Sequence, residues 1–371
     1  HIANSTFTGC VSSNEGAGFY YYRLNGQNNN DEGHITIENT VFENSTSSGE
    51  DGGGSAMWVA NQEEISHGRP FELTFSKCVW RNNAATKRGG AIHYGNSKTL
   101  VGVQMTFEKC QFLNNHAKEE GGAVSLVTKS PIVFSDCVFS GNYVESKTRA
   151  GILTEGTKGG SISVNSKTPL VQITSCSFTN ETSDQGNAIF IHSNVQACLI
   201  SLCTFKNCGK MGTAIVTETP EFMFLNSEVI FDRRLQACRA IEIRTIAVTT
   251  ISKSTFRNCY TENIGAGIYL NNTLQSEEQE DFTLEDTVFD ACQAITDGCA
   301  FFLNVSSSPV IRGLTIQNHK FDINTSVILN YYDFQDLFTL FDCKFRSNSY
   351  QNTRQQDGGG SAIFIANGIK S

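Results

Sequence analysis

The amino-acid sequence predicts an all-β protein, a right-handed parallel β-helix solenoid of about 12 coils with loops of variable length. Three observations predict this fold. Short runs rich in Val, Ile, Thr and Phe alternate with a period of two, which is typical of strands. An aromatic residue recurs about every 31 residues, and a turn rich in Asn and Gly follows it.

The recurring aromatic residue defines an anchor position in each coil. The anchors are Phe7, Phe42, Trp80, Phe112, Phe139, Phe178, Phe205, Phe231, Phe256, Phe289, Ile316 and Phe345. The copies at Phe231 and Ile316 match least well, because they lack the Asn or the Phe. Since each coil places its anchor at the same point, we expect these side chains to stack inside the solenoid as an aromatic ladder.

An Asn follows most anchors, usually two positions on. The main candidates are Asn44, Asn82, Asn114, Asn180, Asn207 and Asn258, with Asn142, Asn318 and Asn348 as further members. We expect them to stack at a turn, each side-chain amide bonding to the neighbouring coils and satisfying backbone groups of the bend. A Gly pair before Ala, as in Gly89-Gly90-Ala91, permits a positive φ at the next bend.

The strands themselves are predicted from four clear runs. They are "LTFSKCVW" from Leu73, "GVQMTFEKC" from Gly102, "SPIVFSDCVF" from Ser130 and "PLVQITSCSF" from Pro169. The stretch "DGGGSAMWVAN" from Asp51 returns almost unchanged as "DGGGSAIFIAN" from Asp357, which indicates two copies of one coil segment.

The 13 cysteines fall mainly at two positions of the repeat. Six precede the anchor by two residues and are expected to be buried free thiols: Cys78, Cys110, Cys137, Cys176, Cys203 and Cys343. Cys259 and Cys292 follow their anchors in successive coils, at a turn, and form a candidate disulfide. Cys198 with Cys203 or Cys208 is another option, and an odd total leaves at least one thiol outside any internal pair.

Six sequons for N-linked glycosylation occur, beginning at Asn4, Asn44, Asn180, Asn271, Asn304 and Asn324. Asn44 and Asn180 coincide with the predicted Asn ladder, so they are unavailable if that ladder is buried. Asn271 and Asn324 lie in predicted loops and are the candidate glycosylation sites.

Composition and motifs argue against several functions. The net charge of −9 disfavours nucleic acid as a partner, and no apolar run is long enough to span a membrane. The sequence contains no CxxC or HExxH, and the seven His share no ligand spacing. Acidic residues lie mainly in loops rather than as paired carboxylates. We therefore expect no enzyme activity, no catalytic residue, no metal and no cofactor.

The paired signatures GGA-aliphatic and F-x-x-N resemble the repeats of chlamydial-type polymorphic outer membrane proteins. The matches include Gly89 to Ile92, Gly121 to Val124, and the anchors followed by Asn such as Phe112 with Asn114 and Asn115. The resemblance implies a pectin-lyase-like parallel β-helix and a surface-exposed, adhesive or structural role. It implies no catalytic residues.

From these observations we expect one repeat domain over residues 1–371, a piece of a longer chain that continues at both ends. The expected function is a non-catalytic structural or adhesive module of a large cell-surface or secreted protein. Its expected partners are other proteins or surface glycans. One alternative is a polysaccharide-active enzyme or a carbohydrate-binding β-helix. A second is a scaffold subunit of a larger filament.

Overall fold

The computed structural model describes residues 1–14, 16–23, 33–49, 53–61, 71–95, 103–145, 156–165, 167–209, 211–232, 237–244, 248–262, 264–271, 281–294, 299–305, 309–321, 328–331, 339–350 and 364–367. Within these ranges the regular structure consists of strands, and no helix occurs. All pairings between these strands are parallel, as in β10 and β14 or β31 and β35. The predicted fold class, a right-handed parallel β-helix, is confirmed.

The chain divides into two compact units, His1–Cys198 and Leu199–Ser371, which are described separately. In each coil the chain runs through sheet 1, then sheet 2, in many coils a short strand, and finally sheet 3. The boundary between the units falls within β24 (Ala197–Ser201), which is a strand of sheet 1. The prediction of one repeat domain over the whole chain stays a prediction.

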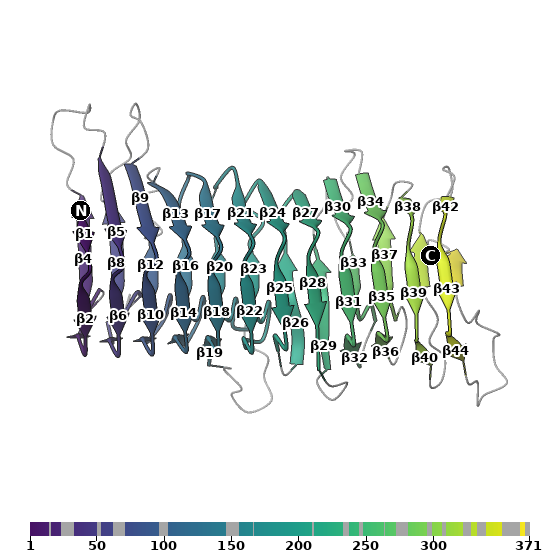
Figure 1. Ribbon diagram of the computed structural model, residues 1–371, viewed down its shortest axis with the longest axis horizontal. Coiled ribbons are helices and arrows are strands. Elements are labelled where there is room, and N and C mark those ends of the chain that lie inside the picture. Colours follow the sequence, from purple (N-terminus) through teal and green to yellow (C-terminus); the bar gives the residue numbers. More distant parts are fainter. Residues whose placement is uncertain are drawn as a thin grey trace. The chain divides into compact units, whose positions relative to one another are not determined.

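Unit 1 contributes six coils, seen as neighbouring arrows in the purple to teal part of Figure 1. Its sheet 1 strands are β1 (Ile2–Ala3), β5 (His34–Glu38), β9 (Phe71–Ser76), β13 (Val103–Glu108), β17 (Ile132–Ser135) and β21 (Val171–Thr174). Its sheet 2 strands are β2 (Thr6–Thr8), β6 (Val41–Glu43), β10 (Val79–Arg81), β14 (Gln111–Leu113), β18 (Val138–Ser140) and β22 (Ser177–Thr179).

The short strands of unit 1 are β3 (Val11–Ser12), β7 (Thr46–Ser47), β11 (Ala84–Ala85), β15 (His116–Ala117) and β19 (Tyr143–Val144). Its sheet 3 strands are β4 (Phe19–Arg23), β8 (Met57–Asn61), β12 (Ile92–Tyr94), β16 (Val124–Leu126), β20 (Ile162–Val164) and β23 (Ile189–Ile191).

Unit 2 repeats this order. In sheet 1 it has β27 (Glu221–Leu225), β30 (Val248–Ser252), β34 (Asp281–Glu285), β38 (Val310–Arg312) and β42 (Thr339–Phe341). In sheet 2 it has β25 (Thr204–Lys206), β28 (Glu228–Ile230), β31 (Thr255–Arg257), β35 (Val288–Asp290), β39 (Thr315–Gln317) and β43 (Lys344–Arg346).

The sheet 3 strands of unit 2 are β26 (Met211–Thr217), β29 (Ala237–Ile243), β33 (Ile268–Asn271), β37 (Phe301–Val305), β41 (Ile328–Tyr331) and β45 (Phe364–Asn367). Its short strands pair as β32 (Tyr260–Thr261) with β36 (Gln293–Ala294) and as β40 (Lys320–Phe321) with β44 (Ser349–Tyr350).

The period-two runs form strands because alternate side chains fill the core. In β13, Val103, Met105 and Phe107 are buried, while the residues between them are half-exposed. The four runs predicted from sequence coincide with β9–β10, β13, β17–β18 and β21–β22. Of the repeated eleven-residue stretch, Met57–Asn61 and Phe364–Asn367 both form sheet 3 strands.

The anchors of unit 1 lie in register and stack. Centroid separations along Phe7, Phe42, Trp80, Phe112, Phe139 and Phe178 are 4.8, 5.5, 4.7, 4.8 and 4.6 Å, with interplanar angles of 3–5°. A second stack from sheet 1, formed by Phe75, Phe107 and Phe134, meets this ladder edge-on. Offset and edge-on ring contacts of this kind add to the energy of apolar burial.

In unit 2 one anchor is corrected. Val229, and not Phe231, pairs with Phe205 on one side and with Phe256 on the other. Phe231 is buried two residues further on. The remaining anchors continue in register through Phe289, Ile316 and Phe345, and Phe256 stacks on Phe289 at 5.0 Å.

The GGA signature has two separate physical causes. Gly89 has a φ of +58°, a conformation that L side chains rarely adopt. Gly90 has no positive φ, but a Cβ there would collide with the carbonyl oxygen of Gly122 in the next coil. The first Gly therefore permits the bend, and the second permits close approach of two backbones.

Candidate functional site

The Asn residues that follow the anchors form an exposed turn. Asn44, Asn82 and Asn114 have φ values of 53–56°, and Asn180, Asn207 and Asn258 have values of 53–59°. Their side chains are exposed in unit 1 and half-buried in unit 2. Asn tolerates this left-handed conformation better than most residues. These residues therefore lie on the outside of the coil and not at a buried bend. Bonds of the expected kind occur between coils there, from Asn82 Nδ2 to Asn44 Oδ1 at 3.3 Å and from Asn258 Nδ2 to the Phe231 carbonyl at 2.8 Å.

The buried ladder of unit 1 lies one residue further along the chain. Asn83 Nδ2 donates to Asn115 Oδ1 at 2.9 Å, and Asn115 Nδ2 donates to Asn142 Oδ1 at 3.0 Å. The same Nδ2 atoms also donate to backbone carbonyls, that of Asn83 to Phe42 and that of Asn115 to Trp80. All three side chains are fully buried, so these bonds satisfy groups that water cannot reach.

Glu181 occupies the same position in the last coil of unit 1, three residues after Phe178. Its carboxyl accepts from the Asn142 backbone N at 2.9 Å, from Asn142 Nδ2 at 3.5 Å and from Ser161 Oγ at 2.5 Å. Burial raises the pKa of Glu181 to about 8, against the hydrogen bonds that favour the charged form. At neutral pH the group is therefore mostly protonated, and its proton can be shared with Ser161 Oγ.

In unit 2 a thiol takes this position in three coils, as Cys208, Cys259 and Cys292. Cys259 and Cys292, the candidate disulfide, are both buried in successive coils, and the structure has them as free thiols in contact with each other. Burial raises the pKa of Cys259 well above its ordinary value, and the neighbouring Cys292 adds to this. A thiol held neutral in this way is a poor nucleophile. The disulfide stays a prediction.

The cysteines before the anchors sit at the corner between sheet 1 and sheet 2. Cys78 Sγ donates to the Ser76 carbonyl at 3.4 Å, two residues back. Thr40, in the preceding coil, makes the equivalent bond to Glu38 O at 2.8 Å, and Ser254 makes it to Ser252 O at 2.8 Å. Because Ser, Thr and Cys occupy this corner interchangeably, the thiol acts there as a small hydrogen-bond donor.

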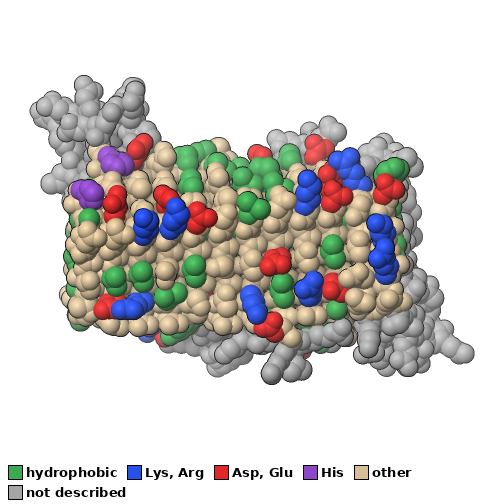
Figure 2. Space-filling view, viewed as in Figure 1, with side chains coloured by type: hydrophobic (Ala, Val, Ile, Leu, Met, Phe, Trp, Pro, Cys, Tyr) green, Lys and Arg blue, Asp and Glu red, His purple; other side chains and the backbone are tan. Residues whose placement is uncertain are grey.

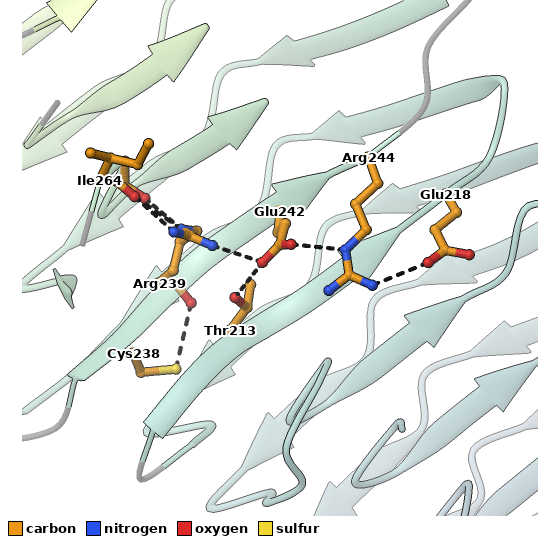
Figure 3. A network of polar contacts seen from close by, with 8 residues as sticks. Thr213, Glu218, Cys238, Arg239, Glu242, Arg244 and Ile264 are labelled. Carbon is orange, nitrogen blue, oxygen red and sulfur yellow. Dashed lines mark hydrogen bonds and ion pairs between the residues drawn. The ribbon is translucent and has the colours of Figure 1, made fainter. Parts of the chain in front are cut away.

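A charged network lies on β26 and β29 of unit 2 (Figure 3). Arg239 Nη1 contacts Glu242 Oε2 at 2.7 Å, and Arg244 Nε contacts Glu242 Oε1 at 2.8 Å. Arg244 Nη1 reaches Glu218 Oε1 at 3.1 Å, and Thr213 Oγ1 donates to Glu242 Oε2 at 3.1 Å. The side chains of Arg239 and Glu242 are only 11% and 15% exposed.

Arg239 also connects the network to the next coil. Arg239 Nη2 donates to the Ile264 carbonyl at 2.8 Å and Nε to the Gly265 carbonyl at 3.0 Å, and the guanidinium lies 4.3 Å from the Tyr269 ring centroid. Burial alone raises the pKa of Glu242, but the two arginines outweigh it and hold the pKa below its ordinary value. The network braces three coils, and its donors and acceptors face one another.

Among the described residues of unit 1, two hydroxyl–imidazole contacts are candidate catalytic arrangements. On the exposed face of sheet 1, Thr36 Oγ1 lies 2.7 Å from His34 Nε2, and His34 Nδ1 lies 3.3 Å from Glu72 Oε2. The other is a buried Ser–His pair on the sheet 3 side. Ser163 Oγ lies 3.4 Å from His192 Nε2. Burial, together with Lys158 and Arg88, lowers the pKa of His192 to about 3. A general base is most effective with a pKa near the working pH. This imidazole is therefore a weak base, and the Ser–His contact is long for an activated nucleophile.

Of the six sequons, Asn4 has an exposed side chain, and the side chain of Asn304, in β37, is not described. The other four fall into three groups. Asn44 and Asn180 have exposed side chains, so burial does not exclude them. Asn271 is the last residue of β33, and its side chain is not described. Asn324 lies outside the described residues.

Glu181 and the charged network were not found from the sequence. Glu181 does carry a signal, since it follows its anchor by three residues as Asn83 and Asn115 do. Arg239 carries none, because most of its partners lie in the next coil, about 25 residues further on.

No group of three or more His, Cys, Asp or Glu in the described ranges could hold a metal ion. Among the same residues, no helix is long and apolar enough to cross a membrane. The chain matches no protein-family model, no curated protein sequence and no solved structure.

Proposed function

We propose that this chain is a non-catalytic structural or adhesive module of a larger cell-surface or secreted repeat protein. One observation carries the proposal. The residues that resemble the polymorphic outer membrane protein repeats each have a role in building the coil: Gly89 and Gly90 permit the bend and the close approach, Asn82 forms the turn, and Trp80 fills the core. A repeat that specifies only the coil leaves the outer faces free to carry contacts.

The buried polar groups support a rigid module. The amides of Asn83, Asn115 and Asn142 bond to one another and to the backbone, and Arg239 and Glu242 neutralise each other. Fully connected buried networks fix one arrangement of neighbouring coils, because any slip between coils leaves donors and acceptors unpaired. Such a module can hold attached domains at a set distance.

The outer face of sheet 1 in unit 1 is the proposed contact surface. Thr36, Thr74 and Thr106 follow one another in register on three coils, and all are half-exposed. Figure 2 shows charged and hydrophobic side chains scattered over the drawn face among backbone and other side chains. The same face carries the carboxylates of Glu38, Glu72 and Glu108 beside these hydroxyls. Such a polar face can bind a protein or a neutral glycan through hydrogen bonds, whereas the net charge of −9 repels polyanions.

Location is tested by labelling intact cells of the natural source. A membrane-impermeant biotin reagent should label the full-length protein, and protease added outside the cells should remove it. A cytosolic marker protein must stay unlabelled in the same sample. A protein protected from both reagents until the cells are lysed would overturn the proposed location.

Adhesion is tested with the purified chain and the natural contact partner cells or surfaces. Thr74→Arg places a bulky charge in the middle of the proposed surface and should reduce binding at least tenfold. Tyr143→Arg makes the same change in charge at an exposed site on a short strand and should bind normally. Equal binding by both variants would exclude this surface, and fragmentation of polyuronides by the wild-type chain would overturn the non-catalytic role.

A further inference from the structure

Two sequons lie on the exposed turn after sheet 2, at two positions of the Asn ladder predicted from the sequence. Asn44-Ser45-Thr46 and Asn180-Glu181-Thr182 both begin at the residue with positive φ. In each, the middle residue points inward and is buried, and the Asn side chain is exposed. At this turn an exposed Asn side chain and a buried side chain therefore belong to adjacent residues.

We propose that Asn44 and Asn180 carry N-linked glycans in the mature protein. The inference rests on the extracellular location proposed above, since the donor is available only along the secretory route. In the reaction, Asn Nδ2 loses a proton and bonds to the first sugar carbon of a lipid diphosphate-linked oligosaccharide. The bond from that carbon to the phosphate oxygen breaks, and the lipid diphosphate leaves.

The contacts at the two residues suit this modification. Asn44 Oδ1 accepts a hydrogen bond from Asn82 Nδ2 at 3.3 Å, which turns the Asn44 amide so that its nitrogen is left for the sugar. Among the described residues, neither Asn44 Nδ2 nor Asn180 Nδ2 donates a hydrogen bond. Adding a glycan therefore breaks no bond that holds the coil, and the exposed side gives it room.

The two sites share one edge of unit 1. Four coil steps separate them, through Asn82, Asn114 and Gly141 at the same turn position. At about 4.8 Å for each step, the two glycans stand roughly 19 Å apart. The intermediate coils lack the Ser or Thr of a sequon two residues on, since Ala84, His116 and Tyr143 stand there. The turn lies at the end of sheet 2 that is away from sheet 1.

The first experiment tests whether Asn44 and Asn180 are modified, independently of where the natural protein is located. The full chain is placed behind a cleavable secretion signal in a eukaryotic cell line, and the secreted protein is treated with an N-glycosidase in heavy-oxygen water. Peptide mass spectrometry should show heavy-oxygen aspartate at positions 44 and 180 in most copies. Bare Asn44 or bare Asn180 in folded, secreted protein would overturn the proposal whatever the natural location is.

Two variants control for the geometry. His116→Thr creates a sequon at Asn114 on the same exposed turn, and Asn114 should then become modified in the same way. Ala85→Thr creates a sequon at the buried Asn83, and the secreted folded fraction should carry no glycan there. Glycan on Asn83 in folded protein would show that the turn geometry does not decide occupancy.

The natural protein completes the test. Glycans at positions 44 and 180 there support both the sites and the location. If the secreted chain is modified while every sequon of the natural protein is bare, including Asn271 and Asn324, the proposed location fails and the accessibility of the turn stands.

Discussion

Replacing Glu181 with Gln keeps the shape of a fully buried side chain and removes its titratable proton. With its oxygen in place of Oε2, the amide can accept from both the Asn142 backbone N and Ser161 Oγ, as the acid does when its proton is on Oε1, and its nitrogen then lies at the longer contact of 3.5 Å to Asn142 Nδ2. The wild-type chain, in contrast, must release this proton into water as the pH rises, and it then holds a charge where water cannot solvate it.

The size of the effect follows from the pKa of Glu181, which is about 8 in the folded chain against an ordinary value of 4.5. Between these values the folded state binds more protons than the unfolded state, so stability is full below about pH 4.5 and is lost as the pH rises toward 8. Each pH unit contributes about 1.4 kcal/mol, giving about 3 kcal/mol at pH 7 and about 5 kcal/mol above pH 8. The Gln variant lacks this loss.

Denaturant unfolding followed by Trp fluorescence measures the difference. The two Trp residues, Trp58 and Trp80, both belong to unit 1, so the signal reports the unit that contains Glu181. The Gln variant should match the wild type near pH 4.5 and exceed it increasingly up to about pH 8. The buried His93 and His192 titrate alike in both proteins and cancel. A constant difference from pH 5 to 9, or a less stable variant at high pH, would refute the reasoning.

Leu202 has a φ of +55° and an exposed side chain, so Leu202→Asn should raise the free energy of unfolding by about 1 kcal/mol. Val310→Asn at an exposed strand position of the same unit should lower it, and circular dichroism unfolding compares the two. Arg239→Met leaves Glu242 buried without its closest partner and should cost about 3–5 kcal/mol, part of which Glu242→Leu should restore in the double variant. No loss in the single variant would exclude the bracing role. His192→Asn should flatten the loss of stability in acid, because the pKa of His192 is lowered to about 3 and the wild type loses stability as the pH falls below 6.5. Trp fluorescence unfolding at about pH 4 and about pH 7 checks this, and parallel profiles would count against it.

The strands and the anchor ladder were predictable because the period of two is local. Leu73 and Phe75 point inward whatever the rest of the chain does, and the same rule places Phe107 and Phe112. The rule fails at Val229 because a buried aromatic residue, Phe231, follows it two residues on. Residues 229 and 231 both point inward by the period of two, so the residue type favoured Phe231 as the anchor. Only the pairing with the neighbouring strands identifies Val229 as the anchor.

The exposed and buried Asn columns could not be separated from sequence. Asn82 and Asn83 are adjacent, and the alternation that distinguishes inside from outside stops where the strand ends. A residue with positive φ turns the chain sharply, so the side chain after it points inward. The runs Asn82-Asn83 and Asn114-Asn115 thus contain one residue of each kind, and Glu181 replaces the second kind.

The charged network was beyond the reach of sequence patterns. Arg239 binds carbonyls of Ile264 and Gly265, about 25 residues further on, and Glu242 binds Thr213 in the coil before. These contacts depend on loop lengths that set which residues meet across coils. The loops vary most in length, so periodicity carries no information about them.

The most direct test of the account compares Asn114→Ala with Asn115→Ala in unit 1. Asn115 accepts from the backbone N and side-chain amide of Asn83 and donates to Trp80 O and Asn142 Oδ1. Its removal should lower the free energy of unfolding by about 3–5 kcal/mol, whereas loss of the exposed Asn114 should cost about 1 kcal/mol. Trp fluorescence unfolding measures both. Equal losses, or a larger loss at Asn114, would contradict the division of the repeat into a turn residue outside and a ladder residue inside.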